Sequence, residues 1–213
     1  KVAKTNFDEE VLRAQNLVFT FNKGLIPDSG LLNKWDTTQY IRFSPAIPGK
    51  FMWTSKTELT FSPLGALLPA SNYTAILDAE LLKYSKEKYN IDKDPLKFHT
   101  PFLDLTGINT YWSLSDELLN QVEIRCQLVF NNPVTPSKLK GLLNVNVSGK
   151  SQSVRILTQS DAETIEIAFP YDVEKSDSDA NGEVIIAKGL SSIGGNTTTT
   201  ENIKKDFLFL RKI

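Results

Sequence analysis

The two side chains with the most versatile chemistry, a thiol and an imidazole, each occur once, as Cys126 and His99. One cysteine cannot form an internal disulfide. Together with one histidine it cannot supply the three or four nitrogen and sulfur ligands of a usual zinc site. A nucleophile-histidine triad would have to be built around His99 alone, and the chain has no G-x-S-x-G, H-E-x-x-H or phosphate-binding glycine loop. The sequence therefore predicts a non-enzyme with no catalytic residue, no metal and no cofactor.

The surroundings of these two residues in the sequence also favour structural roles. Cys126 lies on the apolar side of an alternating run, which predicts a buried structural thiol. His99 lies in a short apolar run near the middle of the chain. A single histidine in a strand is usually a hydrogen-bonding residue at a surface or a junction.

A stretch of acidic residues imitates the start of a calcium-binding loop. Residues 177–182 place oxygen-bearing side chains at alternate positions and end on a glycine. An EF-hand loop would need a bidentate glutamate at its twelfth position, where this chain has Lys188, and no helical pattern flanks the stretch. We therefore interpret it as an exposed Asn-Gly hairpin that leads into a strand.

Tryptophan supplies the remaining candidates for ligand contact, because indole rings on β-sandwiches can stack on sugars. Trp53 belongs to a turn-and-strand pattern that predicts a core position. Trp35 follows a loop and Trp112 follows Tyr111. Trp35 and Trp112 are therefore the candidates for an exposed contact with a ligand or an interface. The interpretation that we favour for both is packing at the junction between two domains.

The charge balance argues against polyanionic partners. The chain has 24 Lys and Arg against 25 Asp and Glu, a net charge of -1, so no positive field attracts nucleic acid or an anionic membrane. No run approaches the roughly 20 apolar residues that span a bilayer. The chain begins at Lys1 and its single methionine is Met52. We therefore expect a piece of a longer or processed protein.

Alternation of apolar and polar residues dominates the chain and predicts half-buried strands. The clearest run extends from Val122 to Phe130. Frequent turn sequences separate the runs, for example Ile47-Pro48-Gly49 and Ser148-Gly149-Lys150. Many short strands with frequent turns indicate an all-β sandwich. The other strands are predicted around residues 17–21, 59–61, 73–77, 98–102, 105–112, 143–147, 154–156, 165–169 and 184–187. Residues 78–89 fit either an amphipathic helical turn or two or a long charged edge hairpin, and we favour a strand that continues from Tyr73, followed by a polar loop.

An internal repeat predicts two domains. The pattern Phe-Asn-x-x-apolar-x-Pro begins at Phe21 and again at Phe130, an offset of 109 residues. The same offset relates Phe98 to Phe207. Two landmarks at one spacing suggest a tandem duplication. We place the domains at residues 1–103 and 104–213, each close to the size of an immunoglobulin-like sandwich.

The first half of the chain resembles the N-terminal macroglobulin-like domains of bacterial alpha-2-macroglobulins. These modules typically show a Phe-x-Phe strand, a P-x-I-x-G-x-x-x-W turn, an L-x-F-x-P strand, a proline-to-tyrosine element and a final F-x-T strand. The second half lacks the P-x-I-x-G-x-x-x-W and proline-to-tyrosine elements and is assigned through the repeat. The matching pieces are Phe19–Phe21, Pro45–Trp53, Leu59–Pro63, Pro69–Tyr73 and Phe98–Thr100.

This resemblance implies a fold, a location and a role. The fold is all-β, with two tandem immunoglobulin-like, macroglobulin-like β-sandwich domains. The location is extracytoplasmic, in the periplasm or at the outer membrane, in a parent protein that is often membrane-anchored. The role is that of a structural and interaction module in a protease-trapping endopeptidase inhibitor, whose partners are proteases or other envelope proteins.

One element of that family is missing from this chain. The family's reactive thioester lies in a Cys-x-Glu-Gln segment, whereas Cys126 is followed by Gln-Leu-Val. Any trapping chemistry must therefore lie elsewhere in a parent chain. The alternative function is an extracytoplasmic glycan-binding or adhesive surface protein built from Ig-like domains.

Overall fold

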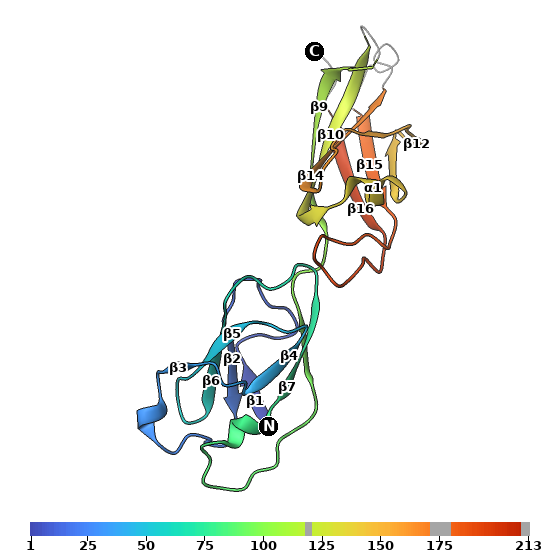
Figure 1. Cartoon of the computed structure of the whole chain (residues 1–213). Helices are drawn as coiled ribbons and strands as arrows, with labels where there is room; N and C mark the ends of the chain where they lie inside the picture. The colour runs from blue at the N-terminus through green and yellow to red at the C-terminus, as the bar shows by residue number, and fades with distance from the viewer. Residues whose placement is uncertain (118–120, 171–179, 210–213) are drawn as a thin grey trace. The chain divides into compact units, whose positions relative to one another are not determined.

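The computed structural model describes residues 1–117, 121–170 and 180–209. The chain divides into two compact units, Lys1–Pro101 and Phe102–Ile213, and each is described by itself. The predicted division after residue 103 lies close to this one. In both units the described strands form antiparallel sheets, as Figure 1 shows, so the predicted all-β, Ig-like fold class is confirmed.

The first unit contains two sheets and two short 3₁₀ turns. One sheet has the strand order β1-β2-β6-β5-β3 and the other has the order β4-β7-β8. The 3₁₀ turns are Ser29–Leu31 and Ala79–Leu82. The strands are β1 (Val2–Thr5), β2 (Leu17–Phe21), β3 (Trp35–Asp36), β4 (Ile41–Ser44), β5 (Gly49–Trp53), β6 (Glu58–Pro63), β7 (Asn72–Leu77) and β8 (Leu96–His99).

Aromatic rings fill the core of the first unit. Trp53 is 2% exposed, and Tyr40 packs edge-on against it with ring centroids 5.7 Å apart. Tyr40 also meets Phe51 edge-on at 5.6 Å. Such T-shaped pairs place a positive ring edge on a negative ring face. The predicted core position of Trp53 is confirmed.

A tyrosine fixes the corner before β7. The hydroxyl of Tyr73 accepts a hydrogen bond of 2.8 Å from the amide of Leu68, five residues upstream. This bond is the tyrosine corner that is typical of Greek-key sandwiches. Burial raises the pKa of Tyr73 above its usual value, so the phenol stays protonated at neutral pH.

An N-terminal segment covers one edge of the first unit. His99 of β8 donates its amide to Glu9 O at 2.7 Å and accepts from the amide of Val11 at 2.9 Å. Glu10 and His99 thus form a parallel bridge. An uncovered strand edge is a template for unwanted pairing, and this bridge closes the end of β8.

The second unit repeats the connectivity of seven strands of the first, but it has four strands in each sheet instead of five and three. Its sheets have the orders β13-β14-β10-β9 and β12-β11-β15-β16. Phe21 and Phe130 both lie in the second strand of their unit, and Phe98 and Phe207 both lie in the last. The elements are β9 (Leu105–Leu114), β10 (Val122–Val134), α1 (Pro136–Lys140), β11 (Leu143–Val147), β12 (Lys150–Ser151), β13 (Arg155–Ile156), β14 (Ala162–Pro170), β15 (Ala180–Ile186) and β16 (Ile203–Phe209).

Three local predictions were wrong, each for a physical reason. The strand predicted over residues 98–102 ends at His99, because Pro101 has no amide hydrogen to continue a ladder. The strand expected after Leu77 is instead a 3₁₀ turn, which Asp78 caps by accepting from the amide of Glu80 at 3.0 Å. Gly182 is not in a hairpin turn but inside β15.

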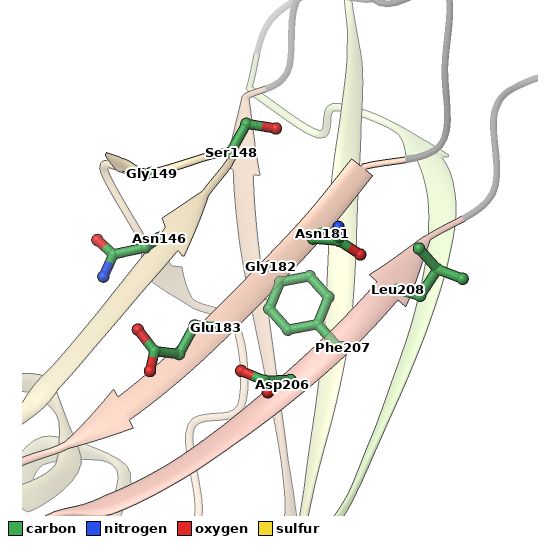
Figure 2. Close-up of a pocket in the computed structure, with 9 residues that line it drawn as sticks. All are labelled: Asn146, Ser148, Gly149, Asn181, Gly182, Glu183, Asp206, Phe207 and Leu208. Atoms are coloured by element: carbon green, nitrogen blue, oxygen red, sulfur yellow. The ribbon is translucent and has the colours of Figure 1, made fainter.

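Gly182 leaves room in the strand for an aromatic ring of the neighbouring strand. It pairs with Phe207 of β16, and a Cβ placed on Gly182 would overlap the Phe207 ring. Figure 2 shows this ring lying at Gly182. The glycine therefore makes room for a buried aromatic side chain rather than for a turn.

We predict that Gly182→Ala lowers the free energy of unfolding by about 1–3 kcal/mol, since the added methyl forces the ring or the strand to move. The matched control is Gly65→Ala, because no atom lies within 4 Å of a Cβ at that position. That control should stay within about 0.5 kcal/mol of the wild type. Urea unfolding measures both variants, and equal stabilities would contradict this role of Gly182.

Candidate functional site

Trp35, predicted as a ligand contact, lies on an edge strand of the first unit. It is 46% exposed and pairs with Met52 of β5. The next residue, Asp36, accepts hydrogen bonds from the hydroxyl of Tyr40 at 2.9 Å and from the amide of Thr38 at 2.8 Å. These bonds tie the two-residue strand β3 to the core, so the exposed indole is held on a fixed backbone.

The outer face around Trp35 carries a mostly apolar row. Cross-strand pairing places Met52 next to Trp35, Thr60 next to Met52, and Val18 next to Thr60. The row crosses four strands of the sheet. It contains no group that could act as an acid, a base or a nucleophile at neutral pH.

Trp112, the second predicted contact, lies on the core side of its sheet. It lies in β9 opposite the buried Ile124 and is itself half-buried. Its neighbour Tyr111 is 40% exposed and lies opposite Arg125, on the outer face. The residue that presents an aromatic ring on this outer face is therefore Tyr111, which the sequence analysis did not select.

A β-bulge decides which face of β9 carries Tyr111. Phe130 pairs with Leu105, but the preceding Val129 pairs with Gly107, so β9 carries one extra residue, Thr106. An extra residue exchanges the two faces of a strand from that point on. Counting alternate positions from the buried Leu105 places Tyr111 inside, whereas the bulge turns it outward. Only the pairing partner reveals this change.

A network of charged side chains surrounds Tyr111 on the outer face. Arg125 contacts Asp116 at 2.6 Å, Glu123 at 3.2 Å and Glu166 at 3.8 Å. The hydroxyl of Tyr111 donates to Glu166. This bond to a carboxylate raises the pKa of Tyr111 above its usual value, so the phenol stays protonated.

Glu123 is the centre of that network. Its side chain is only 4% exposed, and its two oxygens contact Arg125 and Arg155 respectively. Arg155 also contacts Glu117 at 3.0 Å. A buried carboxylate needs such partners, because desolvation of an unpaired charge is very costly. The carboxylates are held by arginines rather than placed as a free acid and base pair.

A shallow polar groove of about 620 Å³ lies on the other sheet of the second unit, and Figure 2 shows its lining. Asn146, Glu183 and Asp206 form one row across β11, β15 and β16. The two carboxylates lie directly opposite each other, a repulsive arrangement. In the parts of the chain that the structure describes, no group of three or more His, Cys, Asp or Glu side chains could hold a metal ion.

Cys126 and His99, the other two candidates from the sequence, lie in surroundings that indicate structural roles. Cys126 is fully buried in β10, which confirms the predicted buried thiol. Burial raises its pKa to about 12. His99 is mostly buried, with Nδ1 3.0 Å from the carbonyl oxygen of Thr100 and 3.9 Å from Glu10. Of the calcium-like stretch, residues 177–179 lie outside the described residues.

In the described part of the chain, none of the helices has the length and apolar character to span a bilayer. The described helical segments are a five-residue α-helix and two 3₁₀ turns.

A sequence comparison identifies a protein that is similar to this chain. Over 150 residues, 69% of the chain, the sequence is 29% identical to the alpha-2-macroglobulin of Pasteurella multocida strain Pm70. The chain is thus similar in sequence to a bacterial alpha-2-macroglobulin. The all-β fold described above fits a macroglobulin-like domain, so the resemblance inferred from the sequence is supported. No protein-family model matches the chain.

The macroglobulin-like chain is short compared with that relative. It covers 8% of the length of the Pasteurella protein. Most of the relative therefore has no counterpart among these 213 residues.

We predict that Cys126 does not react with a thiol reagent such as Ellman's reagent in the native protein at pH 8. Only the thiolate attacks, and burial with a raised pKa removes it. In denaturant the same reagent should detect one thiol per chain within minutes. Rapid reaction of the native protein would show that β10 opens easily.

We predict that Glu123→Gln lowers the free energy of unfolding by about 3 kcal/mol, because it leaves Arg125 and Arg155 without their buried shared partner. The matched control is Glu117→Gln, since Glu117 also contacts Arg155 but its side chain is 64% exposed. That change should cost less than about 1 kcal/mol. Thermal or urea unfolding separates the two, and equal effects would mean that burial of Glu123 is unimportant.

Proposed function

We propose that the chain is a non-enzymatic structural and interaction module from the N-terminal part of a bacterial alpha-2-macroglobulin-like, protease-trapping protein. The observation that carries this proposal is the match to the Pasteurella alpha-2-macroglobulin over 69% of the chain. Two sandwich units that share the connectivity of seven strands support it, because tandem sandwiches are suited to spacing and positioning other parts of a large protein. A periplasmic or outer-membrane-associated location, with proteases or other envelope proteins as partners, belongs to the same proposal.

The described residues also support a non-catalytic role. The buried thiol of Cys126 is not a nucleophile at neutral pH. Cys126 is followed by Gln127, Leu128 and Val129 and cannot form the family's Cys-x-Glu-Gln thioester. Binding by such a module would come from sheet edges, sheet faces and loops. The covalent capture of a protease would be the task of another part of the parent protein.

The proposal predicts a difference between the parent protein and this chain. Trypsin should be mixed with each and tested on a large substrate, casein, and on a small chromogenic peptide. The parent should suppress casein cleavage while most peptide cleavage persists, because a caged protease still admits small substrates. The 213-residue chain alone should change neither rate.

Two results would overturn the proposal. One is loss of small-peptide cleavage caused by the chain alone, which would mean direct inhibition at a protease active site. The other is a parent coding region that ends soon after Ile213 and contains no Cys-x-Glu-Gln segment or further modules. Detection of an internal thioester bond in the intact parent would give independent support.

A rival function is an extracytoplasmic glycan-binding or adhesive surface protein. The observation that favours it is the exposure of Trp35 on an outer sheet face, with its backbone fixed through Asp36. Retention in a polysaccharide-containing gel, lost in Trp35→Ala, would support the rival.

A further inference from the structure

The ring of Tyr111 lies along the surface of its sheet. Tyr111 is on β9, and its hydroxyl donates to Glu166 on β14, while β10 lies between these strands. Two strand spacings amount to about 10 Å, so both side chains must lean toward each other above β10. The phenol therefore extends across β10 on the outer face, where Tyr111 is 40% exposed.

The ring is also held in place. Arg125 is directly opposite Tyr111 in the strand register, and its guanidinium lies 3.8 Å from the same carboxylate oxygen of Glu166 that accepts from the phenol. The position of Glu166 is set in turn by its backbone amide, which donates to the hydroxyl of Thr158 at 2.8 Å. A side chain fixed at both ends loses little further freedom when a ligand binds.

Two uncharged amides lie beside the ring. Asn109 and Gln127 are directly opposite each other on β9 and β10, and Glu166 continues the same row on β14. Neither amide side chain makes a hydrogen bond to another described residue. Each amide offers both donors and an acceptor, so this row can bind groups that donate and accept at once.

The charged side chains near Tyr111 form ion pairs with one another. Asp116 and Glu123 contact Arg125, and Glu117 contacts Arg155. The carboxylates of Asp116, Glu117, Glu123 and Glu166 share two guanidinium groups, those of Arg125 and Arg155. The described residues of this outer face therefore offer no spare positive charge to an anionic ligand. What remains available to a ligand is an aromatic ring face and two neutral amides.

We propose that Tyr111, Asn109 and Gln127 form a binding site for a neutral oligosaccharide. A pyranose ring has an apolar face of C–H groups that stacks on an aromatic ring, and its hydroxyls both donate and accept hydrogen bonds, as the two amides require. The site is formed by the second unit alone. It does not depend on protease trapping by the parent protein, so the two proposals can fail separately.

The test is a titration of the full 213-residue chain with maltohexaose, cellohexaose, xylohexaose and N-acetylchitohexaose, followed by amide chemical shifts. At least one hexasaccharide is expected to shift resonances of β9 and β10. Tyr111→Ala should weaken its binding by about tenfold or more, the loss of about 1.4 kcal/mol of stacking. Gln127→Leu, which leaves the ring intact, should weaken binding several-fold.

The matched control is Trp35→Ala, which removes an exposed aromatic ring from the first unit and should leave the affinity unchanged. Thermal unfolding of each variant verifies that the fold is retained. The proposal is overturned if none of the four hexasaccharides binds, or if binding is lost in Trp35→Ala but kept in Tyr111→Ala. It is also overturned if a tetra-arginine peptide binds at Tyr111 and no oligosaccharide does, which would identify a site for cationic segments.

Discussion

Strand β10 must bury every second side chain, and the second unit depends on that constraint. Ile124, Cys126 and Leu128 point into the core, so the residues between them have to lie on the opposite face. A slip of one residue would reverse the two sets. The register of β9 and β14 is fixed by β10, and this fixed register brings together Tyr111, Arg125 and Glu166.

Much of this fold could be predicted because periodicity of two is a local property of the sequence. The alternation from Val122 to Phe130 predicted both a strand and the burial of Cys126. The sequence could not reveal the bulge at Thr106, since a bulge is defined by the partner strand. Gly182 was misinterpreted for a related reason, because the ring that requires a glycine there belongs to another strand. Tyr111 was missed because only tryptophan was considered as an aromatic contact.

The two units share the order of seven strands, although the second lacks the turn-and-tryptophan segment of the first. Phe21 and Phe130 occupy equivalent strands, as do Phe98 and Phe207. Shared connectivity with different surfaces is common, because a sandwich needs only its core pattern and function lies in sites on its faces. Trp35 and Tyr111 illustrate this, since each unit presents a different aromatic residue on an outer face.

The bridge between Glu10 and His99 has a consequence for biosynthesis. It joins the first loop of the first unit to its last strand, so it is a contact of very long sequence separation, and such contacts form late and slowly. During synthesis the amino-terminal segment leaves the ribosome well before its partner exists. The first unit therefore cannot close its edge until β8 has emerged, and the nascent chain has an open strand edge that a chaperone could bind in the meantime.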